Sequence, residues 1–527
     1  MTNPVSDISK AEVILIIGSN TTENHPVISH YVKRAVKFNG QKLIVADPRN
    51  LTIAQFAEKW IRPTPGTDVA WINGVIHVIL KEGLQDQAFI DHRCDNYGAL
   101  VKSVEPFTPE HVEMLTGIDG DDIVAVARLY AGAENASILY CMGITQHSHG
   151  TDNVKALANL AMVTGNLGRA GTGVNPLRGQ NNVQGACDMG GLPNVFTGYQ
   201  PVTDTAIVKR METAWGVTGM SFQEGLTVTE MVPKAHDGEL KCLYVVGENP
   251  LVSDPDLSHA EESFKNLEFL VVQDIFLTET AQLADVVFPA KAFAEKNGTF
   301  TNTERKVQRV RKAVNGPGNA KADWEIIAGV STAMGYPMAC ISAEEIFQEI
   351  SRVTPSYAGI TYAGIDEEGL HWPCPIVGHP GTPVLHTKSF SRGKGLFHEI
   401  AFTPPAEGVD DTYPLVLTTG RVLYHYHTGT MTRKSDGLND RSPECFVEIS
   451  PEDASRYHLK DQSMADVYSR RGKIRVKVKI SQTACEGTIF IPFHFAEAAV
   501  NRLTSAALDP VAKIPEYKVC AVAISPG

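Results

Sequence analysis

One permanent cation, Arg178, stands in a stretch that is otherwise made of small, amide-bearing and glycine residues. The stretch runs from Asn175 to Gly190 and reads NPLRGQNNVQGACDMG. Residues of these types form poor helices and poor strands, so we expect a loop whose backbone and amides face a large polar ligand. The planar guanidinium group of an arginine matches two carboxylate oxygens, which suits a small carboxylate. A single arginine in a glycine-rich loop is more often a solvated surface residue, but the length of this run favours a binding loop.

The composition limits the classes of protein that the chain can be. It has 527 residues, enough for about three domains, and a net charge of −13, which argues against nucleic acid or an anionic membrane surface as a partner. No apolar run reaches the roughly 20 residues of a membrane helix. The N-terminal residues do not form a signal peptide, and twin arginines occur only at Arg470 and Arg471. We therefore expect a cytoplasmic protein without membrane insertion.

The cysteines do not form a recognisable metal or cluster motif. There are nine of them, at positions 94, 141, 187, 242, 340, 374, 445, 485 and 520. No two are spaced as CxxC, so we expect free thiols in a reducing compartment and assign no iron–sulfur cluster to this chain.

Two segments of the chain share one pattern, which indicates an internal repeat. Each copy has an apolar strand, a Gly-x-Asn turn, a helical stretch and a second strand that ends in an aspartate. The first copy has strands at 13–17 and 43–46, a helical stretch at 26–38, the turn Gly18-Ser19-Asn20 and Asp47; the second has strands at 242–246 and 269–273, the turn Gly247-Glu248-Asn249 and Asp274. Seven residues after each aspartate comes an Ala-Gln-apolar-Ala-acid run, at 54–58 and 281–285. The shared order and spacing make coincidence a poor explanation.

The repeat predicts two parallel βαβ halves, each able to receive a nucleotide-like ligand. Continuous apolar strands that alternate with helices are typical of parallel sheets covered on both faces. A glycine turn after the first strand lets a phosphate approach a helix N-terminus, and an acid after the second strand is placed for a sugar or base. Neither copy has a full GxGxxG, so a nicotinamide cofactor is not supported.

The rest of the chain divides into helical sequence, a linker and a β-rich end. Core helices are expected at 121–131 and 154–163, with a strand from 137 running into a ligand-facing loop that ends at 146. A Pro- and Gly-rich linker follows at 373–405. Short strands are then expected at 415–417, 446–449, 464–468, 473–480 and 488–491, which predicts a C-terminal barrel.

Taken together, these motifs closely resemble the molybdenum- or tungsten-dependent formate dehydrogenases, a family that binds two pterin-guanine dinucleotides. The resemblance runs over essentially the whole chain. It implies an α/β fold with two doubly wound parallel-sheet cofactor-binding domains at 1–180 and 181–390, and a β-barrel domain at 408–527 that caps both cofactors. The two half-repeats would then correspond to the two dinucleotides.

The resemblance also implies roles for individual residues. Around the first dinucleotide and the metal it places Gly18, Ser19, Asn20, Asp47, Arg49, Gly66, Asp68, Met142 and Gln146. Around the second dinucleotide it places Asn249, Gln273, Asp274, Lys296 and Asp323. From the barrel it adds Thr419, Gly420, Arg421, His425, His427, Thr428, Phe493, Asn501 and Lys518. We assign no metal ligand, because His425 and His427 lack a third ligand nearby and His147 and His149 fit a polar loop better.

The implied reaction is the reversible oxidation of formate to CO₂, two electrons and a proton, with Arg178 holding the formate. An electron-transfer subunit with iron–sulfur clusters would be the partner. Two alternatives stay open: another bis-pterin oxidoreductase, such as a nitrate reductase, and a non-catalytic or split-subunit cofactor-binding protein. The sequence does not distinguish molybdenum from tungsten, and it fixes neither the electron acceptor nor the oligomeric state.

The chain departs from the family at its start. The family begins with a cysteine cluster for one 4Fe–4S centre, followed by a cysteine or selenocysteine that binds the metal and a histidine beside it. This chain shows neither feature, and Met1 aligns shortly after the position of that metal ligand. We therefore expect the C-terminal part of a longer enzyme, which by itself has little or no activity.

Overall fold

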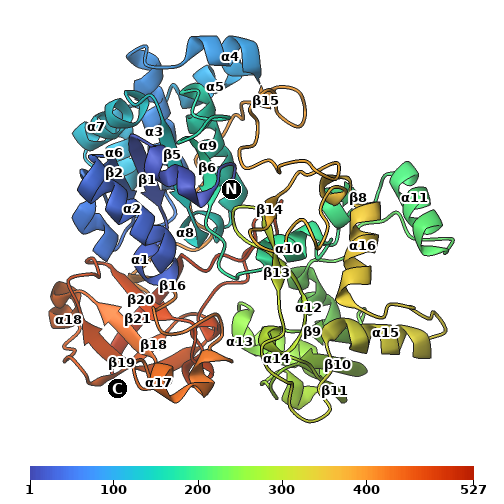
Figure 1. The fold of residues 1–527 in the computed structure, drawn as a ribbon. Helices are drawn as coiled ribbons and strands as arrows, with labels where there is room; N and C mark the ends of the chain where they lie inside the picture. Colours follow the sequence, from blue (N-terminus) through green and yellow to red (C-terminus); the bar gives the residue numbers. More distant parts are fainter. The chain divides into compact units, whose positions relative to one another are not determined.

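The chain folds into two compact units, and the computed structural model describes all residues from 1 to 527 (Figure 1). Unit 1 comprises Met1–Leu177, Val252–Ser258 and Val384–Gly527. Unit 2 comprises Arg178–Leu251 and His259–Pro383. None of the helices combines the length and the apolar composition that crossing a membrane requires. The domain limits expected from the sequence stay a prediction.

The N-terminal part of unit 1 is built on a five-stranded parallel sheet. Its strands lie in the order β3-β2-β1-β5-β6, with β1 at Val13–Ile17, β2 at Lys42–Ala46, β3 at Lys59–Ile61, β5 at Ala136–Tyr140 and β6 at Gly173–Pro176. Alternate residues of β1 enter different cores, because Leu15 and Ile17 face one side of the sheet and Ile14 and Ile16 the other. All five β1 residues are buried, so helices cover both faces, as a parallel sheet requires.

The covering helices differ in how deeply they are buried. On one face, α3 (Asp68–Lys81) packs with α7 (Gly120–Ala131) and α9 (Gly150–Val163), and α3 is buried on almost every side. On the other face lies the amphipathic α2 (Pro26–Asn39), which begins at a proline and ends at Gly40 in the left-handed conformation. The remaining helices of this part are α1 (Thr21–Asn24), α4 (Gln87–Arg93), α5 (Tyr97–Val104), α6 (Pro109–Thr116) and α8 (Met142–Thr145). The short strands β4 (Cys94–Asp95) and β15 (Gly395–Leu396) pair in parallel.

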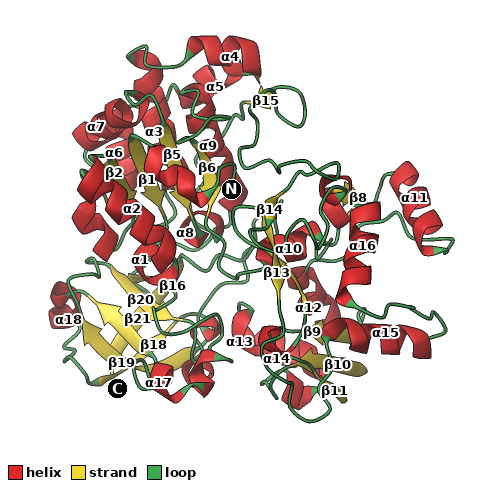
Figure 2. Cartoon of the chain, viewed as in Figure 1, coloured by secondary structure: helices red, strands yellow, loops and turns green.

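The C-terminal part of unit 1 is a closed six-stranded barrel (Figure 2). Around the barrel the strands follow the order β16 (Leu415–Gly420), β20 (Thr488–Pro492), β17 (Phe446–Ile449), β19 (Lys473–Ile480), β18 (Met464–Tyr468) and β21 (Cys520–Pro526). Inward-facing residues such as Leu417, Val447 and Val478 fill its interior. The helices α17 (Asp436–Asn439) and α18 (Pro451–Arg456) connect strands of the barrel.

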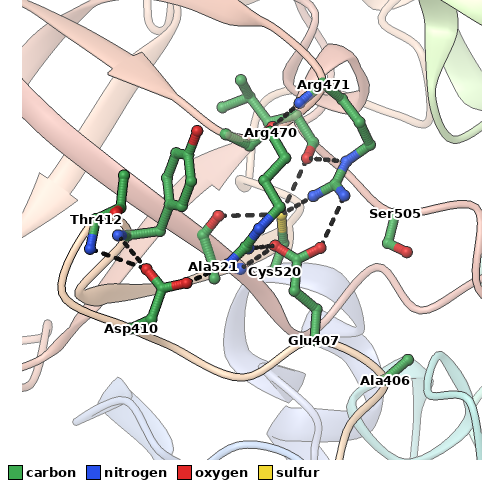
Figure 3. Close-up of polar contacts among 12 residues, drawn as sticks. Ala406, Glu407, Asp410, Thr412, Arg470, Arg471, Ser505, Cys520 and Ala521 are labelled. Atoms are coloured by element: carbon green, nitrogen blue, oxygen red, sulfur yellow. Dashed lines mark hydrogen bonds and ion pairs between the residues drawn. The ribbon is translucent and has the colours of Figure 1, made fainter.

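A network of ionic and hydrogen bonds fastens the segment before β16 to the barrel (Figure 3). The Glu407 carboxylate accepts bonds of 2.7 Å from Arg470 and from Arg471, and a third from the backbone N–H of Ala521 at 3.2 Å. The second terminal nitrogen of Arg471 lies 3.1 Å from the Cys520 sulfur. Burial raises the pKa of the Cys520 thiol to about 11, so this cysteine stays protonated at neutral pH. The twin arginines therefore have a structural place within the barrel.

Unit 2 contains a smaller parallel sheet with the strand order β11-β10-β9. Its strands are β9 (Cys242–Val246), β10 (Phe269–Asp274) and β11 (Val286–Pro289). An antiparallel group, β12 (Gly298–Thr301), β13 (Lys306–Val310) and β14 (Leu370–His371), lies in the same unit. The helices are α10 (Val183–Asp188), α11 (Thr205–Trp215), α12 (Val228–His236), α15 (Asp323–Ala333) and α16 (Ala343–Val353), while α13 (Pro250–Ser253) and α14 (Leu257–Lys265) cross the unit boundary. A two-stranded pair, β7 (Val195–Phe196) and β8 (Gln200–Pro201), completes the unit.

The fold class predicted from the sequence is confirmed, with two corrections of detail. Both copies of the repeat form parallel sheets in the same strand order, and the C-terminal strands close into a barrel. The expectation of a loop throughout 175–190 is wrong, because β6 ends at Pro176 and α10 forms at Val183–Asp188. Hydrogen bonds to the Asp188 carboxylate stabilise this helix against its poor intrinsic propensity: one comes from Gln184 within the helix, and tertiary ones come from Tyr199 and Tyr357. The last barrel strand, β21, was not predicted.

Candidate cofactor and substrate site

The first glycine turn of unit 1 lies against a second backbone segment. Gly18 follows β1 with a φ of +56°, and its carbonyl accepts a 3.0 Å hydrogen bond from the N–H of Gly143. A Cβ atom on Gly18 would lie 2.8 Å from the carbonyl carbon of Gly143. Both glycines are therefore needed for this close approach, which brings the loop after β5 beside the turn after β1.

A cavity opens beside this turn, and residues from the sheet and from the barrel line it. It brings together thirteen of the residues that the sequence predicted: Gly18, Ser19, Asn20, Asp47, Arg49, Gly66, Asp68, Met142, Thr419, Gly420, Arg421, Phe493 and Lys518. All of them belong to unit 1, although they come from positions up to 500 residues apart. Turns at the carboxyl ends of parallel strands are where open α/β sheets bind ligands.

Several buried polar atoms on the cavity wall have no hydrogen-bond partner within the protein. Three of them are the Ser19 hydroxyl, the Asn20 side-chain oxygen and the Nε of Arg49. Leaving a buried polar group unpaired costs about 1–3 kcal/mol, so three such groups on one wall indicate a polar ligand that would satisfy them. The donor and acceptor set suits a dinucleotide, which offers phosphate oxygens, sugar hydroxyls and base edges.

The charged groups of the cavity are poorly solvated. Burial raises the pKa of Asp47 to about 6 and that of Asp68 to about 7. Burial also lowers the pKa of Lys518 to about 8, and its ammonium group donates to the Thr419 carbonyl oxygen at 2.5 Å. Arg49 is held on one side by Glu448, and its guanidinium carbon lies 3.6 Å from the centre of the Phe490 ring. The cations Arg49, Arg421 and Lys518 give the cavity a surface that favours an anionic group.

The loop after β5 contributes a histidine that stays uncharged. His147 is almost completely buried, and its Nε2 lies 2.8 Å from the Gly143 carbonyl oxygen, an acceptor. Burial lowers the pKa of His147 to about 3, so the ring is neutral at physiological pH. Met142 lines the cavity, whereas Gln146 is buried at the end of α8 and is not part of the lining. Within the ligand-facing loop that was expected to end at 146, the structure forms the short helix α8.

The barrel loop between β16 and β17 is fastened by a histidine that the sequence did not single out. The backbone N–H of Val422 donates to Nε2 of His494 at 3.0 Å, and Nδ1 of His494 lies 2.5 Å from the carbonyl oxygen of His427. In this arrangement Nε2 accepts a hydrogen bond and Nδ1 donates one, as a neutral imidazole can. Burial accordingly lowers the pKa of His494 to about 3. The predicted residues His425 and Thr428 bond within this loop region, to Thr432 and Ser442 and to Thr430 respectively.

Asn501 has a different local role from the residues of the cavity. Its side-chain amide donates to the carbonyl oxygens of Val252 and Ser253, both at 3.0 Å. It therefore tethers the short segment 252–258 of unit 1 to the barrel part of the same unit. Its side-chain oxygen is buried without a partner in the protein.

In unit 2, the predicted residues of the second copy form two adjoining groups. The Gln273 amide donates to Asp323 at 2.8 Å, and Lys296 forms an ion pair with the same carboxylate. Asn249 is bonded instead to Thr280 and Glu279. Asp274 accepts bonds from the backbone N–H groups of the two residues that follow it, and burial raises its pKa.

Arg178 is half-buried at the start of unit 2, in the segment between β6 and α10. Its backbone N–H donates to the Thr303 hydroxyl at 3.0 Å, which ties the segment to the turn between β12 and β13. The same turn is fixed by Arg305, which is buried in a left-handed conformation and donates to the carbonyl oxygens of Trp372, Thr382 and Pro383.

Further residues of the cavity wall were not named as binding residues from the sequence, among them Cys141, Phe490 and Thr418. Cys141 and Phe490 belong to apolar stretches that predict buried positions, so no local signal marks them. His147 was considered only as part of a polar loop. Among the side chains, no group of three or more His, Cys, Asp or Glu residues could hold a metal ion.

Comparisons with known proteins agree with this geometry. Residues 1–333 match the family model "Molybdopterin oxidoreductase", and residues 415–521 match the model of a molybdopterin dinucleotide binding domain. The chain is 51% identical to the F420-dependent formate dehydrogenase 1 subunit alpha of Methanococcus maripaludis, over 99% of this chain and 78% of that protein. It is 39% identical to formate dehydrogenase H of Escherichia coli, over 100% of this chain and 74% of that protein.

A solved structure supports the fold independently. Acetylene hydratase from Pelobacter acetylenicus superposes with a TM-score of 0.78 at 20% sequence identity, covering 99% of this chain and 81% of that one. At this identity the likeness concerns the fold alone. The first family model covers the residues of both parallel sheets, and the second covers most of the barrel. The second match includes the cavity-lining residues from 418 to 518. The chain belongs to the molybdopterin oxidoreductase family and carries its dinucleotide-binding domain.

Proposed function

We propose that this protein is the catalytic subunit of a formate dehydrogenase, which oxidises formate reversibly to CO₂, two electrons and a proton. The observation that carries the proposal is the 51% identity to a formate dehydrogenase alpha subunit along 99% of the chain. The second relative, with 39% identity over the full chain, has the same named activity. Neither of these relatives is named for nitrate reduction, which the sequence alone left open.

The proposed cofactor is a pair of molybdopterin-guanine dinucleotides carrying molybdenum or tungsten. The cavity of unit 1 would hold one dinucleotide, with Gly18, Ser19 and Asn20 at the turn and Arg421 and Lys518 beside its phosphates. In unit 2, Gln273, Lys296 and Asp323 are the side chains that would contact the other. When bound, the cofactor supplies the redox chemistry that accepts the two electrons of formate.

The protein's own contribution to the reaction is to bind and orient the substrate. The Arg178 guanidinium would hold both oxygens of formate through paired N–H bonds, which fixes the direction of the C–H bond. Because formate is an anion and CO₂ is neutral, the same cation binds the substrate more tightly than the product. Asn and Gln side chains and glycine backbone groups from 179 to 185 offer further donors without bulk. The proposed partner is an electron-transfer subunit with iron–sulfur clusters.

Formate-dependent reduction of a dye by the purified, cofactor-loaded holoenzyme tests the proposal. Here the holoenzyme is the complete enzyme, with the iron–sulfur and metal-ligand region that the family resemblance implies, because this chain by itself is expected to have little or no activity. Arg178→Lys keeps the charge but removes the planar fork, and we expect kcat/KM for formate to fall by about 100-fold or more. The matched control is Arg311→Lys in the same unit, whose exposed side chain pairs with Asp366. A holoenzyme that reduces nitrate but does not oxidise formate, or an Arg178→Lys variant within about threefold of wild type, would contradict the proposal.

A further inference from the structure

The most extensively bonded buried carboxylate of unit 2 lies just after the substrate loop and has no part in the chemistry described above. Asp188 ends α10 and has no exposed surface. Its Oδ1 accepts bonds from the Gln184 amide at 2.8 Å and from the Tyr199 hydroxyl at 2.9 Å, and its Oδ2 accepts one from the Tyr357 hydroxyl at 2.5 Å. A buried carboxylate is stable only when its lone pairs are satisfied in this way.

The bonds of Asp188 continue to the strand that holds the Arg178 segment. The Tyr357 hydroxyl also lies 3.0 Å from the hydroxyl of Thr301, at the end of β12. The backbone N–H of Thr301 donates to the Asn182 side chain at 2.8 Å. Two residues further on, the hydroxyl of Thr303 accepts the 3.0 Å bond from the backbone of Arg178. The segment from Arg178 to Asp188 is thus fixed to one hairpin end at its start, near its middle and at its end.

The packing between α10 and β12 leaves little room for movement. A Cβ atom on Gly185 would lie 2.2 Å from the Asn182 side-chain oxygen and 3.3 Å from the backbone nitrogen of Thr301. The charge of Arg178 also reaches this network: burial raises the pKa of the Tyr199 hydroxyl, and the positive charge of Arg178 opposes that rise. The cation and the carboxylate network therefore occupy one region of unit 2.

We propose that Asp188 is a positioning residue for substrate binding, which acts through Tyr357 and Thr301 to hold Arg178 in the orientation that a small carboxylate requires. This inference rests on the proposed function, because it assigns the orienting role to Arg178. The loop residues themselves have little helix or strand propensity, so their conformation depends on bonds of this kind. Both oxygens of Asp188 accept hydrogen bonds, and each neighbouring side chain (Gln184, Tyr199 and Tyr357) donates one. No neutral side chain of similar size offers two acceptor oxygens.

The test compares three variants of the holoenzyme. Asp188→Asn replaces one acceptor with an N–H₂ group that faces a tyrosine hydroxyl, and Tyr357→Phe removes the link between Asp188 and Thr301. Tyr336→Phe is the matched control, because Tyr336 belongs to the same unit and loses a hydroxyl bond to the Trp215 carbonyl oxygen, outside this network. Cofactor content and thermal unfolding of each variant are measured first, so that a general loss of folding is recognised.

Two readouts decide the inference. Hydrogen–deuterium exchange of peptides covering 175–190 should become about tenfold faster in Asp188→Asn and Tyr357→Phe, while the control exchanges as wild type does. In the same variants, kcat/KM for formate should fall about tenfold, with a rise in KM as the main part. Exchange that stays at the wild-type rate overturns the inference, and so does a loosened segment with unchanged kcat and KM.

A double-variant comparison separates positioning from general stability. If Asp188 acts through Arg178, then Asp188→Asn should reduce kcat/KM much less in an Arg178→Lys background than in the wild type, because the affected contact is already lost. Fully additive effects would contradict the inference. A wild-type holoenzyme that does not oxidise formate would defeat the proposed function instead, whereas the exchange experiment would still report whether Asp188 anchors the segment.

Discussion

The two copies of the internal repeat have the same strand order but different surroundings. In the first copy all five residues of β1 are buried, whereas in the second only Val245 of β9 is. Both turns are closed by the same hydrogen bond, from the glycine N–H to the strand beside it: Gly18 to Ala46 and Gly247 to Gln273. Local sequence therefore sets the turn and the pairing, while the neighbours of each sheet set how much of it is buried.

The asparagines of the two turns also differ, in whether the protein itself satisfies their side-chain oxygens. The side-chain oxygen of Asn20 faces the cavity of unit 1 without a partner in the protein. The equivalent oxygen of Asn249 accepts bonds from the backbone and hydroxyl groups of Thr280. The Gly-x-Asn turn is shared by both copies. Its asparagine oxygen is thus available to a ligand in the first copy, whereas in the second copy it is hydrogen-bonded within the protein. Paired substitutions at equivalent positions can test this difference.

The largest difference is expected at the two turn glycines. In Gly18→Ala the new Cβ would meet the backbone of Gly143 at 2.8 Å, in addition to the strain of a φ of +56°. In Gly247→Ala only the strain remains, since nothing lies within 4 Å of the new atom. We expect losses of unfolding free energy of about 4 kcal/mol for the first and about 1–2 kcal/mol for the second. Urea denaturation of both variants measures them, and equal losses would break the comparison.

A smaller difference is expected from the last residue of each first strand. Ile17 is completely buried and Val246 is 45% exposed, although they occupy the same place in the repeat. Ile17→Ala should cost about 3 kcal/mol of unfolding free energy and Val246→Ala less than about 1 kcal/mol, because only the first leaves a cavity in a packed core. If Val246→Ala proved as costly as Ile17→Ala, then β9 would be covered in solution by a part of the protein or by a partner.

The comparison also shows which features a single sequence can predict. Strands β1, β2, β9 and β10 lie where their apolar runs predicted them, because a continuous run between turn residues specifies a buried parallel strand. Helix α10 was missed, since bonds to Asp188 from outside the helix help to stabilise it, and one of their donors, Tyr357, lies 169 residues away from Asp188. The fastening of the barrel loop by His494 was missed for the same reason. Local patterns do not report contacts between distant segments.

For the candidate site, as for the fold, the sequence indicated which residues take part but not which distant residues hold them. Thirteen residues that the family resemblance implied line one cavity. Arg49 illustrates what was not predictable: its contacts with Glu448 and Phe490 join segments about 400 residues apart. The family resemblance indicated that Arg49 belongs to the site, but only the structure identifies the residues that hold it.

The smallest difference concerns the aspartates that end the second strands. Burial raises the pKa of Asp47 to about 6, against about 4 in an unfolded chain, and burial also raises the pKa of Asp274. A carboxyl group whose pKa is raised by folding stabilises the protein below the unfolded pKa, and this contribution is lost as the pH rises through the folded pKa. The cofactor-free protein should therefore lose stability between pH 4 and pH 6 or slightly above.

Asp47→Asn removes this pH dependence and keeps an acceptor for the backbone N–H of Arg49, which lies 3.0 Å from the carboxylate. At pH 4 the variant should be close to wild type, and at pH 8 more stable by about 1–2 kcal/mol, after allowance for water in the cavity. Asp274→Asn should change in the same direction but by less, because Asp274 is less buried. Urea midpoints at the two pH values measure both. A larger gain for Asp274→Asn would mean that the second strand end, rather than the first, has the more costly charge, and it would reverse the contrast between the two copies.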